Sequence, residues 1–394
     1  MAYPANLPVW RCECGHYLDL EFHPVFDKGK LDDCKSLWRY SQVLPLDNPA
    51  GAISFDEGFT PLVQADYKGV NFLAKMEFLL PTGSFKDRGA AVMISRCREL
   101  GVKEIAEDSS GNAACSIAAY CSKAAISSNI FMPVGNSSGK SIQAKAYGAK
   151  LHLVAGSREE CAEAAIRKAR ESYYASHAWN PLFLHGTKTI IYEIVEQLGW
   201  RVPDYIFMPV GNGTLMIGIS IGLREMISAG VVDSMPKLIG VQSDRCAPLK
   251  DYFPDDYSIS KEYNSDTVEY NPNNNERPSD NICKKQTFDQ KKPGMVQTGV
   301  SPMAEGILVR GPVRIKQIVK AIRDSGGGVV TVSDTEIKEA LKASFRQGIY
   351  VEPTSAAPVA ALSKYKARLC GNETIVVPLT GSGMKTFAAI SDLL

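Results

Sequence analysis

From Pro61 onward the chain alternates strand-like and helix-like segments, and this alternation limits the possible folds more than any other feature. Such an order predicts an α/β fold with mostly parallel sheets flanked by helices. In such sheets ligands collect beyond the carboxyl ends of the strands, where glycine turns lead into helices. We expect strands over 70–78, 103–107, 129–134, 150–154, 205–210, 237–241, 328–332 and 374–378, and helices over 90–100, 113–123, 141–147, 158–174, 187–198, 215–228, 313–323, 334–346, 355–364 and 385–392.

Two regions fall outside the alternation. Residues 1–60 are irregular and rich in Pro, Trp and Tyr, so we expect an N-terminal arm packed on the body. Residues 251–298 are polar, with five Asn and Pro residues at 271–275, and form either a long surface insertion or a mobile loop. The length of 394 residues allows two to three domains or one large one.

Charge and cysteine usage narrow the class of protein. The net charge of +1 indicates no nucleic-acid or anionic-membrane partner, and no apolar run is long enough to span a bilayer. The N-terminus lacks a signal peptide, so a cytoplasmic location is expected. The ten cysteines are scattered and do not form a disulfide framework. Cys12 and Cys14, with Cys34 nearby, have the wrong spacing for a zinc knuckle, so we expect no metal.

Gly83-Ser84-Phe85-Lys86-Asp87-Arg88-Gly89 links a predicted strand to a predicted helix. The backbone amides at the N-terminus of a helix disfavour the protonated form of a lysine on the glycine-led turn that enters the helix. Lysine imines to aldehyde cofactors are a recurrent catalytic device. Lys86 is therefore a candidate Schiff-base lysine, although an isolated lysine at this position is more often an ordinary surface residue.

Three further turns follow predicted strands. Residues 108–113 (Asp-Ser-Ser-Gly-Asn-Ala) place hydroxyls and an amide at a helix start, which suits an anion such as a carboxylate or serves only as a helix cap. Residues 209–214 (Pro-Val-Gly-Asn-Gly-Thr) let the backbone close round an anion, but lack the third glycine of a dinucleotide motif. Residues 379–385 (Leu-Thr-Gly-Ser-Gly-Met-Lys) offer a hydroxyl to a ring nitrogen, or form a turn without a ligand.

Together, in this order, the four turns resemble the fold-type II enzymes that use pyridoxal 5'-phosphate (PLP), a two-domain class that includes the tryptophan synthase β-subunit. The match is best to the threonine synthase-like family and runs from about Thr60 to the end of the sequence. The resemblance implies that Lys86 forms the internal aldimine. It also implies that Asn112 binds the phenolic oxygen of PLP, that Gly211, Asn212, Gly213 and Thr214 bind its phosphate, that Thr380 faces its ring nitrogen, and that Ser84, Ser110, Gly111, Ala113 and Lys188 bind substrate.

The resemblance also carries expectations for the whole protein. Residues 61–90 and 191–394 would form a large PLP-binding domain, and 91–190 a small mobile domain that closes on the substrate and excludes water. The reaction would be a β- or γ-elimination or replacement on a small-molecule amino acid, with Lys86 removing the α-proton. A neutral ring nitrogen opposite Thr380 would favour elimination and replacement over transamination. Relatives are commonly homodimers, so we expect a homodimer.

One departure from the family pattern bears on the substrate. Threonine synthases hold the phosphate of O-phosphohomoserine with an arginine where this chain has Phe183, in Asn180-Pro181-Leu182-Phe183. Lys188, His185 or Arg277 could compensate. We therefore favour a lyase or synthase acting on another amino acid, such as a threonine or serine dehydratase or a cysteate-type synthase. A threonine synthase with an altered phosphate pocket is the alternative, and a catalytically retired PLP-binding regulator is a third reading, which the retained Lys86 disfavours.

Overall fold

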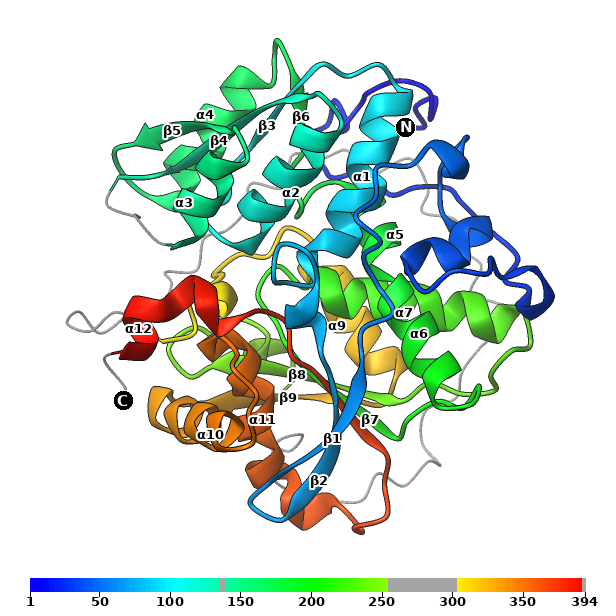
Figure 1. Ribbon diagram of the computed structural model, residues 1–394, viewed down its shortest axis with the longest axis vertical. Coiled ribbons are helices and arrows are strands. Elements are labelled where there is room, and N and C mark those ends of the chain that lie inside the picture. Colours follow the sequence, from blue (N-terminus) through cyan, green and yellow to red (C-terminus); the bar gives the residue numbers. More distant parts are fainter. Residues whose placement is uncertain (135–138, 254–302, 392–394) are drawn as a thin grey trace.

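The computed structural model describes residues 1–134, 139–253 and 303–391. Within these ranges the strands form two sheets, one below the other in Figure 1. The larger sheet has the order β1-β2-β10-β7-β8-β9, and the smaller has the order β5-β4-β3-β6. The strands are β1 (Leu62–Tyr67), β2 (Val70–Lys75), β3 (Glu104–Glu107), β4 (Ser127–Pro133), β5 (Lys150–Val154), β6 (Tyr173–Tyr174), β7 (Tyr205–Pro209), β8 (Lys237–Ser243), β9 (Gly328–Val332) and β10 (Ile375–Pro378).

The helices connect these strands in the α/β manner. They are α1 (Lys86–Glu99), α2 (Asn112–Lys123), α3 (Gly139–Ala146), α4 (Arg158–Lys168), α5 (Pro181–Thr187), α6 (Thr189–Gln197), α7 (Thr214–Ser228), α9 (Ile315–Asp324), α10 (Asp334–Arg346), α11 (Pro353–Tyr365) and α12 (Phe387–Ser391). Several begin with local signals that the sequence carries. Ser157 and Ser333, for example, form capping boxes with the glutamate three residues later.

All described strand pairs are parallel except one. The exception is the β1–β2 hairpin, whose two-residue turn consists of Lys68 and Gly69, both with positive φ. The parallel sheets and their helices confirm the predicted α/β fold. Every parallel strand therefore sends its carboxyl end toward the same edge of its sheet, which is where the candidate turns lie.

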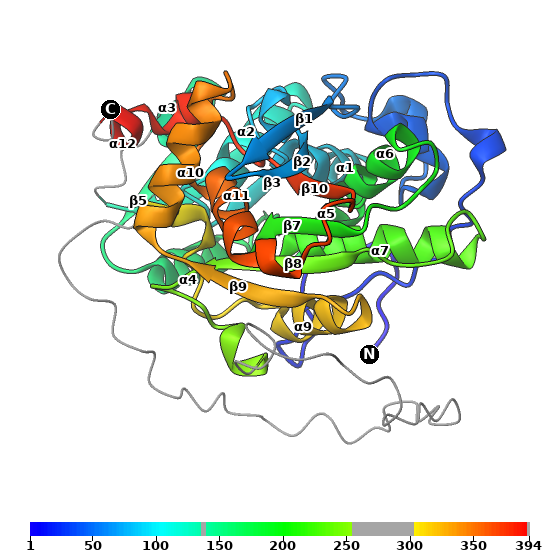
Figure 2. The same ribbon diagram turned by 90° about the horizontal axis from the view of Figure 1, so that it is seen from below.

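Helices cover both faces of the larger sheet. One apolar cluster joins the sheet to α6, α7 and α9, and a second joins it to α10 and α11. Figure 2 shows α10 and α11 on one side of β7–β9 and α9 on the other. The smaller sheet is covered by α1 and α2 on one face and by α4 on the other. Helix α1 thus lies between the sheets, and its first residue is Lys86.

Several segments differ from the sequence expectations. The helix expected over 158–174 ends at Lys168, and the chain then forms β6, which pairs with β3. The helix expected from 187 is preceded by a separate helix, α5. Strand β1 was not expected. The predicted insertion 251–298 lies outside the described residues apart from 251–253, and Arg277 lies outside them.

Side chains from the first 60 residues contact later parts of the chain. The Trp10 ring lies 4.6 Å from the Tyr174 ring and 5.7 Å from the Trp179 ring. Asp19 pairs with the buried Arg314 at 2.6 Å, tying the arm to the segment that precedes α9. In the part of the chain that the structure describes, no helix is both long and apolar enough to cross a membrane.

Candidate active site

The Lys86 turn is fixed by a neighbouring turn that lies far away in sequence. Phe85 N donates to Thr380 O at 3.0 Å, and Ser382 N donates to Gly83 O at 2.9 Å. Gly83 has φ +79°, and a Cβ there would meet the Lys385 side chain at 2.9 Å, so this turn needs glycine. The first and fourth candidate turns of the sequence therefore lie side by side.

Lys86 extends from the start of α1 to a third candidate turn. Its Nζ donates to Thr214 Oγ1 at 3.2 Å. The rings of Phe85 and Phe183 lie 4.6 Å and 5.6 Å from Nζ. Burial lowers the pKa of Lys86 to about 8, although Glu107 and Glu352 oppose this shift. A lysine with this pKa is partly neutral near pH 7.5, which a nucleophilic amine requires.

A buried ionic cluster anchors the helix that begins with Lys86. Arg88 donates through Nε and Nη2 to Glu77 and through Nη1 and Nη2 to Glu193, at 2.6–2.7 Å. Lys75 Nζ pairs with Glu193 at 2.8 Å. All four side chains have no exposed surface. The cluster joins β2, α1 and α6, and so fixes the first turn of α1 relative to the larger sheet.

The turn between β7 and α7 is shaped by two glycines. Gly213 has φ +74°, and a Cβ there would meet Ile318 at 2.2 Å. A Cβ on Gly211 would meet the carbonyl oxygen of Gly306 at 2.6 Å. The turn leads directly into the N-terminus of α7, which begins at the buried Thr214 and has no side-chain cap. Such a helix start favours an anion.

The start of α2 is connected to the larger sheet through polar side chains. Asn112 Nδ2 donates to Glu352 Oε1 at 2.8 Å, and Lys385 Nζ donates to Asn112 Oδ1 at 3.1 Å. Lys140 of α3 lies 3.0 Å from Glu352 Oε2. Glu352 is buried at the N-terminus of α11. The sequence analysis missed Glu352, although the following Pro353 is a helix-start signal that would have directed attention to it.

The fourth turn places one more hydroxyl in the interior. Thr380 is buried, and its Oγ1 lies 3.2 Å from Ser355 Oγ. Ser84 is also fully buried, and its Oγ has no hydrogen-bond partner in the described part of the protein. Ser110, Gly111 and Ala113 all lie at the start of α2, on the same turn as Asn112.

A histidine and a glutamate that the sequence analysis did not single out adjoin this cluster. Glu107 ends β3, and His177 follows the neighbouring strand β6. His177 Nδ1 lies 2.7 Å from Glu107 Oε1, and Nε2 lies 3.2 Å from Asn212 Nδ2. The His177 ring packs edge-on against Phe183, with 5.9 Å between centroids. Only the rule that ligands gather beyond parallel strand ends could have found this pair.

Two of the three residues proposed to compensate for the missing arginine, Lys188 and His185, contact other side chains. Lys188 Nζ pairs with Glu225 at 2.7 Å, and burial lowers its pKa to about 8. His185 packs against Phe22 of the arm, 5.5 Å between centroids. Phe183 is fully buried against Gly89, where an added Cβ would meet its ring at 2.4 Å. The substrate-binding role of Lys188 thus stays a prediction.

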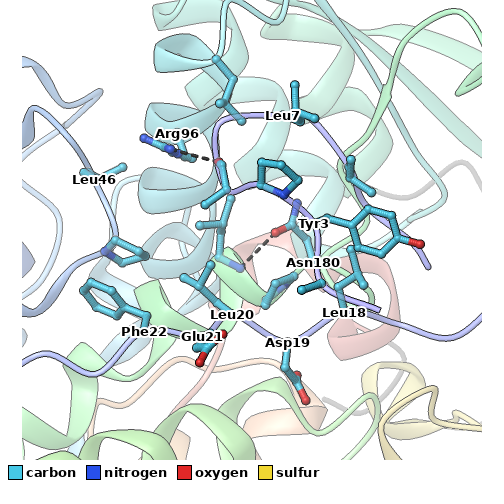
Figure 3. A pocket seen from close by; sticks show the side chains of 18 of the residues that line it. Tyr3, Leu7, Leu18, Asp19, Leu20, Glu21, Phe22, Leu46, Arg96 and Asn180 are labelled. Atoms are coloured by element: carbon cyan, nitrogen blue, oxygen red, sulfur yellow. Dashed lines mark hydrogen bonds between the residues drawn. The ribbon is translucent and has the colours of Figure 1, made fainter. Parts of the chain in front are cut away.

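A cavity of about 520 Å³ lies elsewhere, under the N-terminal arm. Its walls include Tyr3, Leu18, Phe22 and Arg96, with Asn180 from the start of α5 (Figure 3). None of Lys86, Asn112, Thr214 and Thr380 lines it. The converging turns are therefore separate from this cavity.

The residues of the converging turns fit PLP. The glycine turn at the start of α7 suits a phosphate group, and the desolvated Lys86 amine suits an aldehyde. The unpartnered hydroxyl of Ser84 marks a polar position that a bound group can satisfy. Lys86 also contacts Thr214 directly, so the amine that suits an aldehyde lies next to the turn that suits a phosphate.

Comparisons with known proteins agree with this fit. Residues 53–381 match the family model described as pyridoxal-phosphate dependent enzyme. The threonine synthase of Methanocaldococcus jannaschii is 32% identical over 97% of this chain and 90% of the relative. The threonine synthase of Methanosarcina acetivorans is 34% identical over 99% of this chain and 91% of the relative.

Solved structures share the fold at lower identity. An L-serine ammonia-lyase from Rhizomucor miehei has a TM-score of 0.66 and 18% identity, covering 85% of this chain and 96% of its own. A processed threonine deaminase isoform from Solanum lycopersicum has a TM-score of 0.65 and 22% identity, covering 99% of this chain and 94% of its own. Both confirm the fold alone.

Proposed function

The chain belongs to the pyridoxal-phosphate dependent enzyme family and to its threonine synthase-like branch, and from this premise we propose that its substrate is an amino acid other than O-phosphohomoserine. As a member, it is a PLP-dependent lyase or amino-acid synthase. The observation that carries the proposal is Phe183, a fully buried phenyl ring 5.6 Å from Lys86 Nζ. An apolar ring at this position offers a phosphate dianion no charge-assisted hydrogen bond.

In this proposal the four turns hold the cofactor. Gly211, Asn212, Gly213 and Thr214 bind its phosphate at the start of α7, and Lys86 binds its aldehyde carbon. Asn112 would bind the phenolic oxygen of its ring, and Thr380 would face the ring nitrogen. When bound, PLP supplies an electron sink for negative charge at the α-carbon of the substrate.

The remaining work belongs to side chains of the protein. The Lys86 amine accepts the α-proton, because its lowered pKa leaves it partly neutral near pH 7.5. Ser84 and the start of α2, with Ser110, Gly111 and Ala113, bind the substrate carboxylate through hydroxyls and backbone amides. Residues 91–190 form the small domain that closes over the site and excludes water.

Threonine synthase remains the second candidate. It is favoured by the identity of 32–34% to two threonine synthases over nearly the whole chain. On this alternative, a cation other than one at position 183 would bind the phosphate of O-phosphohomoserine.

Absorbance spectra of the purified protein, titrated with amino acids and followed by product analysis, distinguish these candidates. We expect O-phospho-L-homoserine to leave the visible band of the bound cofactor unchanged. L-threonine, L-serine or O-phospho-L-serine should shift the band and yield a keto acid or a replacement product. Formation of threonine and phosphate from O-phospho-L-homoserine would instead identify a threonine synthase.

We also propose a homodimer in the cytoplasm. Symmetric dimers are the commonest oligomers, and the cysteines in the described ranges form no disulfide, which is usual in reducing compartments. Sedimentation of the purified protein tests the dimer directly.

A further inference from the structure

We propose that Cys12 and Cys14 form a redox-active dithiol, which small-molecule disulfides such as oxidised glutathione convert into an intramolecular disulfide. Cys14 makes the first attack on the small disulfide, and Cys12 completes the bond. This modification site lies within the first 60 residues, apart from the converging turns, and it does not depend on the proposed function.

The two sulfur atoms face each other on a small hairpin. Arg11 and Tyr17 pair in the antiparallel sense, and Cys12 N donates to His16 O at 3.0 Å. Between these residues the chain turns, and Cys14 Sγ comes to lie 2.8 Å from Cys12 Sγ. Because the sulfur atoms are already in contact, a disulfide can form with little movement of the backbone.

Both ends of this hairpin are held by later parts of the chain. Trp10, which precedes it, packs edge-on against Tyr174 of β6 and Trp179. At the other end the Arg314 guanidinium lies 4.2 Å from the centre of the Tyr17 ring. The two cysteines are therefore preorganised by contacts that lie outside the hairpin itself.

The surroundings of Cys12 favour its thiolate. Cys14 Sγ donates to Cys12 Sγ, as do Tyr3 Oη at 3.5 Å and Cys14 N at 3.4 Å. These hydrogen bonds hold the pKa of the Cys12 thiol below its usual value. The thiolate is the form that attacks a disulfide. Since the Cys12 residue is only 6% exposed, it suits the second, intramolecular step.

Cys14 suits the first step, because it is exposed and a small disulfide can reach it from solvent. A metal ion would need further ligands beside these two sulfur atoms. Within residues 1–134, 139–253 and 303–391, no group of three or more His, Cys, Asp or Glu side chains could hold one. We therefore assign thiol chemistry to the pair.

The reaction balances in two exchange steps. The Cys14 thiolate attacks one sulfur of the small disulfide, whose S–S bond breaks with its electron pair on the other sulfur, and a small thiolate leaves. The Cys12 thiolate then attacks the Cys14 sulfur and expels the second small thiolate. The two cysteines lose two electrons and two protons, and the small disulfide gains them and ends as two thiols.

The test follows this bond in the intact PLP-loaded protein. The reduced protein is incubated with oxidised glutathione at pH 7.5, quenched with N-ethylmaleimide and digested with trypsin without a reductant. Trypsin cleaves after Arg11 and Lys28, so peptide 12–28 carries both cysteines and no other. We expect mass spectrometry to find this peptide lighter by two hydrogen atoms, without glutathione or maleimide. Dithiothreitol should restore both thiols.

Single variants separate the two roles. In Cys12→Ser the mixed disulfide of Cys14 with glutathione should accumulate, because no thiol is in place to complete the bond. In Cys14→Ser, peptide 12–28 should react at least about tenfold more slowly than in wild type, because Cys12 is buried. Cys370→Ser is the control, since Cys370 is also exposed, and it should leave the oxidation of peptide 12–28 unchanged.

Unfolding the protein tests whether the geometry of the hairpin matters. In concentrated urea the ratio of internal to mixed disulfide on peptide 12–28 should fall by at least about tenfold, because the unfolded chain no longer holds the sulfur atoms together. Equal ratios in the folded and unfolded states would overturn the inference. So would a persistent mixed disulfide on Cys14, or a fully reduced peptide 12–28, in the folded wild-type protein.

Discussion

At the scale of single residues, Lys86 connects local structure to reactivity. The amine is partly buried and donates to Thr214, and burial destabilises its charged form. The surrounding glycines serve a different purpose, because they let backbone and helix starts approach one another. The properties of the site thus depend on a few side chains in tightly determined positions.

The rate at which cofactor-free protein captures PLP should follow the ionisation of Lys86. Because burial lowers its pKa to about 8, the neutral fraction grows about tenfold per pH unit below that value and levels off above it. Stopped-flow absorbance between pH 6 and 10.5 measures this. A rate that keeps rising to pH 10.5 would show a lysine with an ordinary pKa, and Lys86→Ala should abolish the band.

Gly213→Ala should weaken cofactor binding far more than Gly230→Ala. Both positions have positive φ and carry similar backbone strain, of order 1 kcal/mol, but only the Cβ at Gly213 meets another residue, Ile318 at 2.2 Å. The two glycines flank opposite ends of α7, which makes them a matched pair. Titration of each cofactor-free variant with PLP gives the affinity. Equal affinities would mean that the turn does not contact the cofactor.

At the scale of elements, the buried ionic cluster of Arg88, Glu77, Glu193 and Lys75 joins α1, β2 and α6 through ion pairs. Burial opposes ionisation of Glu193, but Arg88 and Lys75 outweigh it and lower the pKa of Glu193 to about 2. A depressed carboxyl pKa stabilises the fold above the unfolded-state value near 4.5, and this contribution is lost as the pH falls toward 2.

Glu193→Gln should therefore destabilise the protein by about 3–5 kcal/mol near pH 7, because Arg88 and Lys75 lose their shared anion. The difference from wild type should shrink between pH 4.5 and 2, as measured by urea unfolding at several pH values. The matched control is Glu339→Gln, which removes an exposed pair with Lys68 and should change stability by less than about 1 kcal/mol. If the difference in unfolding free energy between wild type and Glu193→Gln did not change with pH, it would contradict the lowered pKa of Glu193.

Helices and strands differed in how well they could be predicted from the sequence. Long periodic elements such as α7 and α10 were anticipated nearly to their ends, since capping and periodicity are local signals. Strand β6 was missed because two residues become a strand only by pairing with β3. Helix α5 was missed because Gly186 lowers helix propensity, yet a Cβ there would meet Arg88 O at 2.1 Å.

The residues of the candidate site also differ in whether a local sequence pattern could predict them. Lys86, Asn112, Thr214 and Thr380 lie on turns with recognisable sequence patterns, so they could be named before the structure. Their roles stay predictions, although the structure brings Lys86 to Thr214. Glu107 and His177 are 70 residues apart and meet only because β3 and β6 are neighbours. Long-range pairing of this kind has no local signature.

At the scale of the whole molecule, polar contacts connect the smaller sheet and its helices to the larger sheet. Lys140 of α3 pairs with Glu352 of α11, and Asn112 of α2 also binds Glu352. Asn212 Nδ2 and His177 Nε2 form a separate contact at 3.2 Å. If residues 91–190 move as a unit, these contacts break on opening and form again on closure.

Lys140→Met should weaken the contact between α3 and the N-terminus of α11, because it removes the Lys140–Glu352 ion pair. The variant leaves a buried glutamate without its cation, so the segment of α3 should exchange its amide hydrogens faster than in wild type. Lys168→Met is the matched control, because Lys168 pairs with Glu104 within the smaller sheet and its helices. Hydrogen–deuterium exchange measured by mass spectrometry compares the two. Unchanged exchange over 139–146 would show that Lys140 does not hold the two parts together.

Strand β10 has a consequence for how the protein is made. It is synthesised after β7, β8 and β9 but lies between β2 and β7, so a growing chain carries two unpaired strand edges until 375–378 leaves the ribosome. Thr380 and Gly381 emerge with it. The smaller sheet, formed from one continuous stretch, has no such delay. If Thr380 faces the cofactor as proposed, the complete site can form only after this last strand has been synthesised.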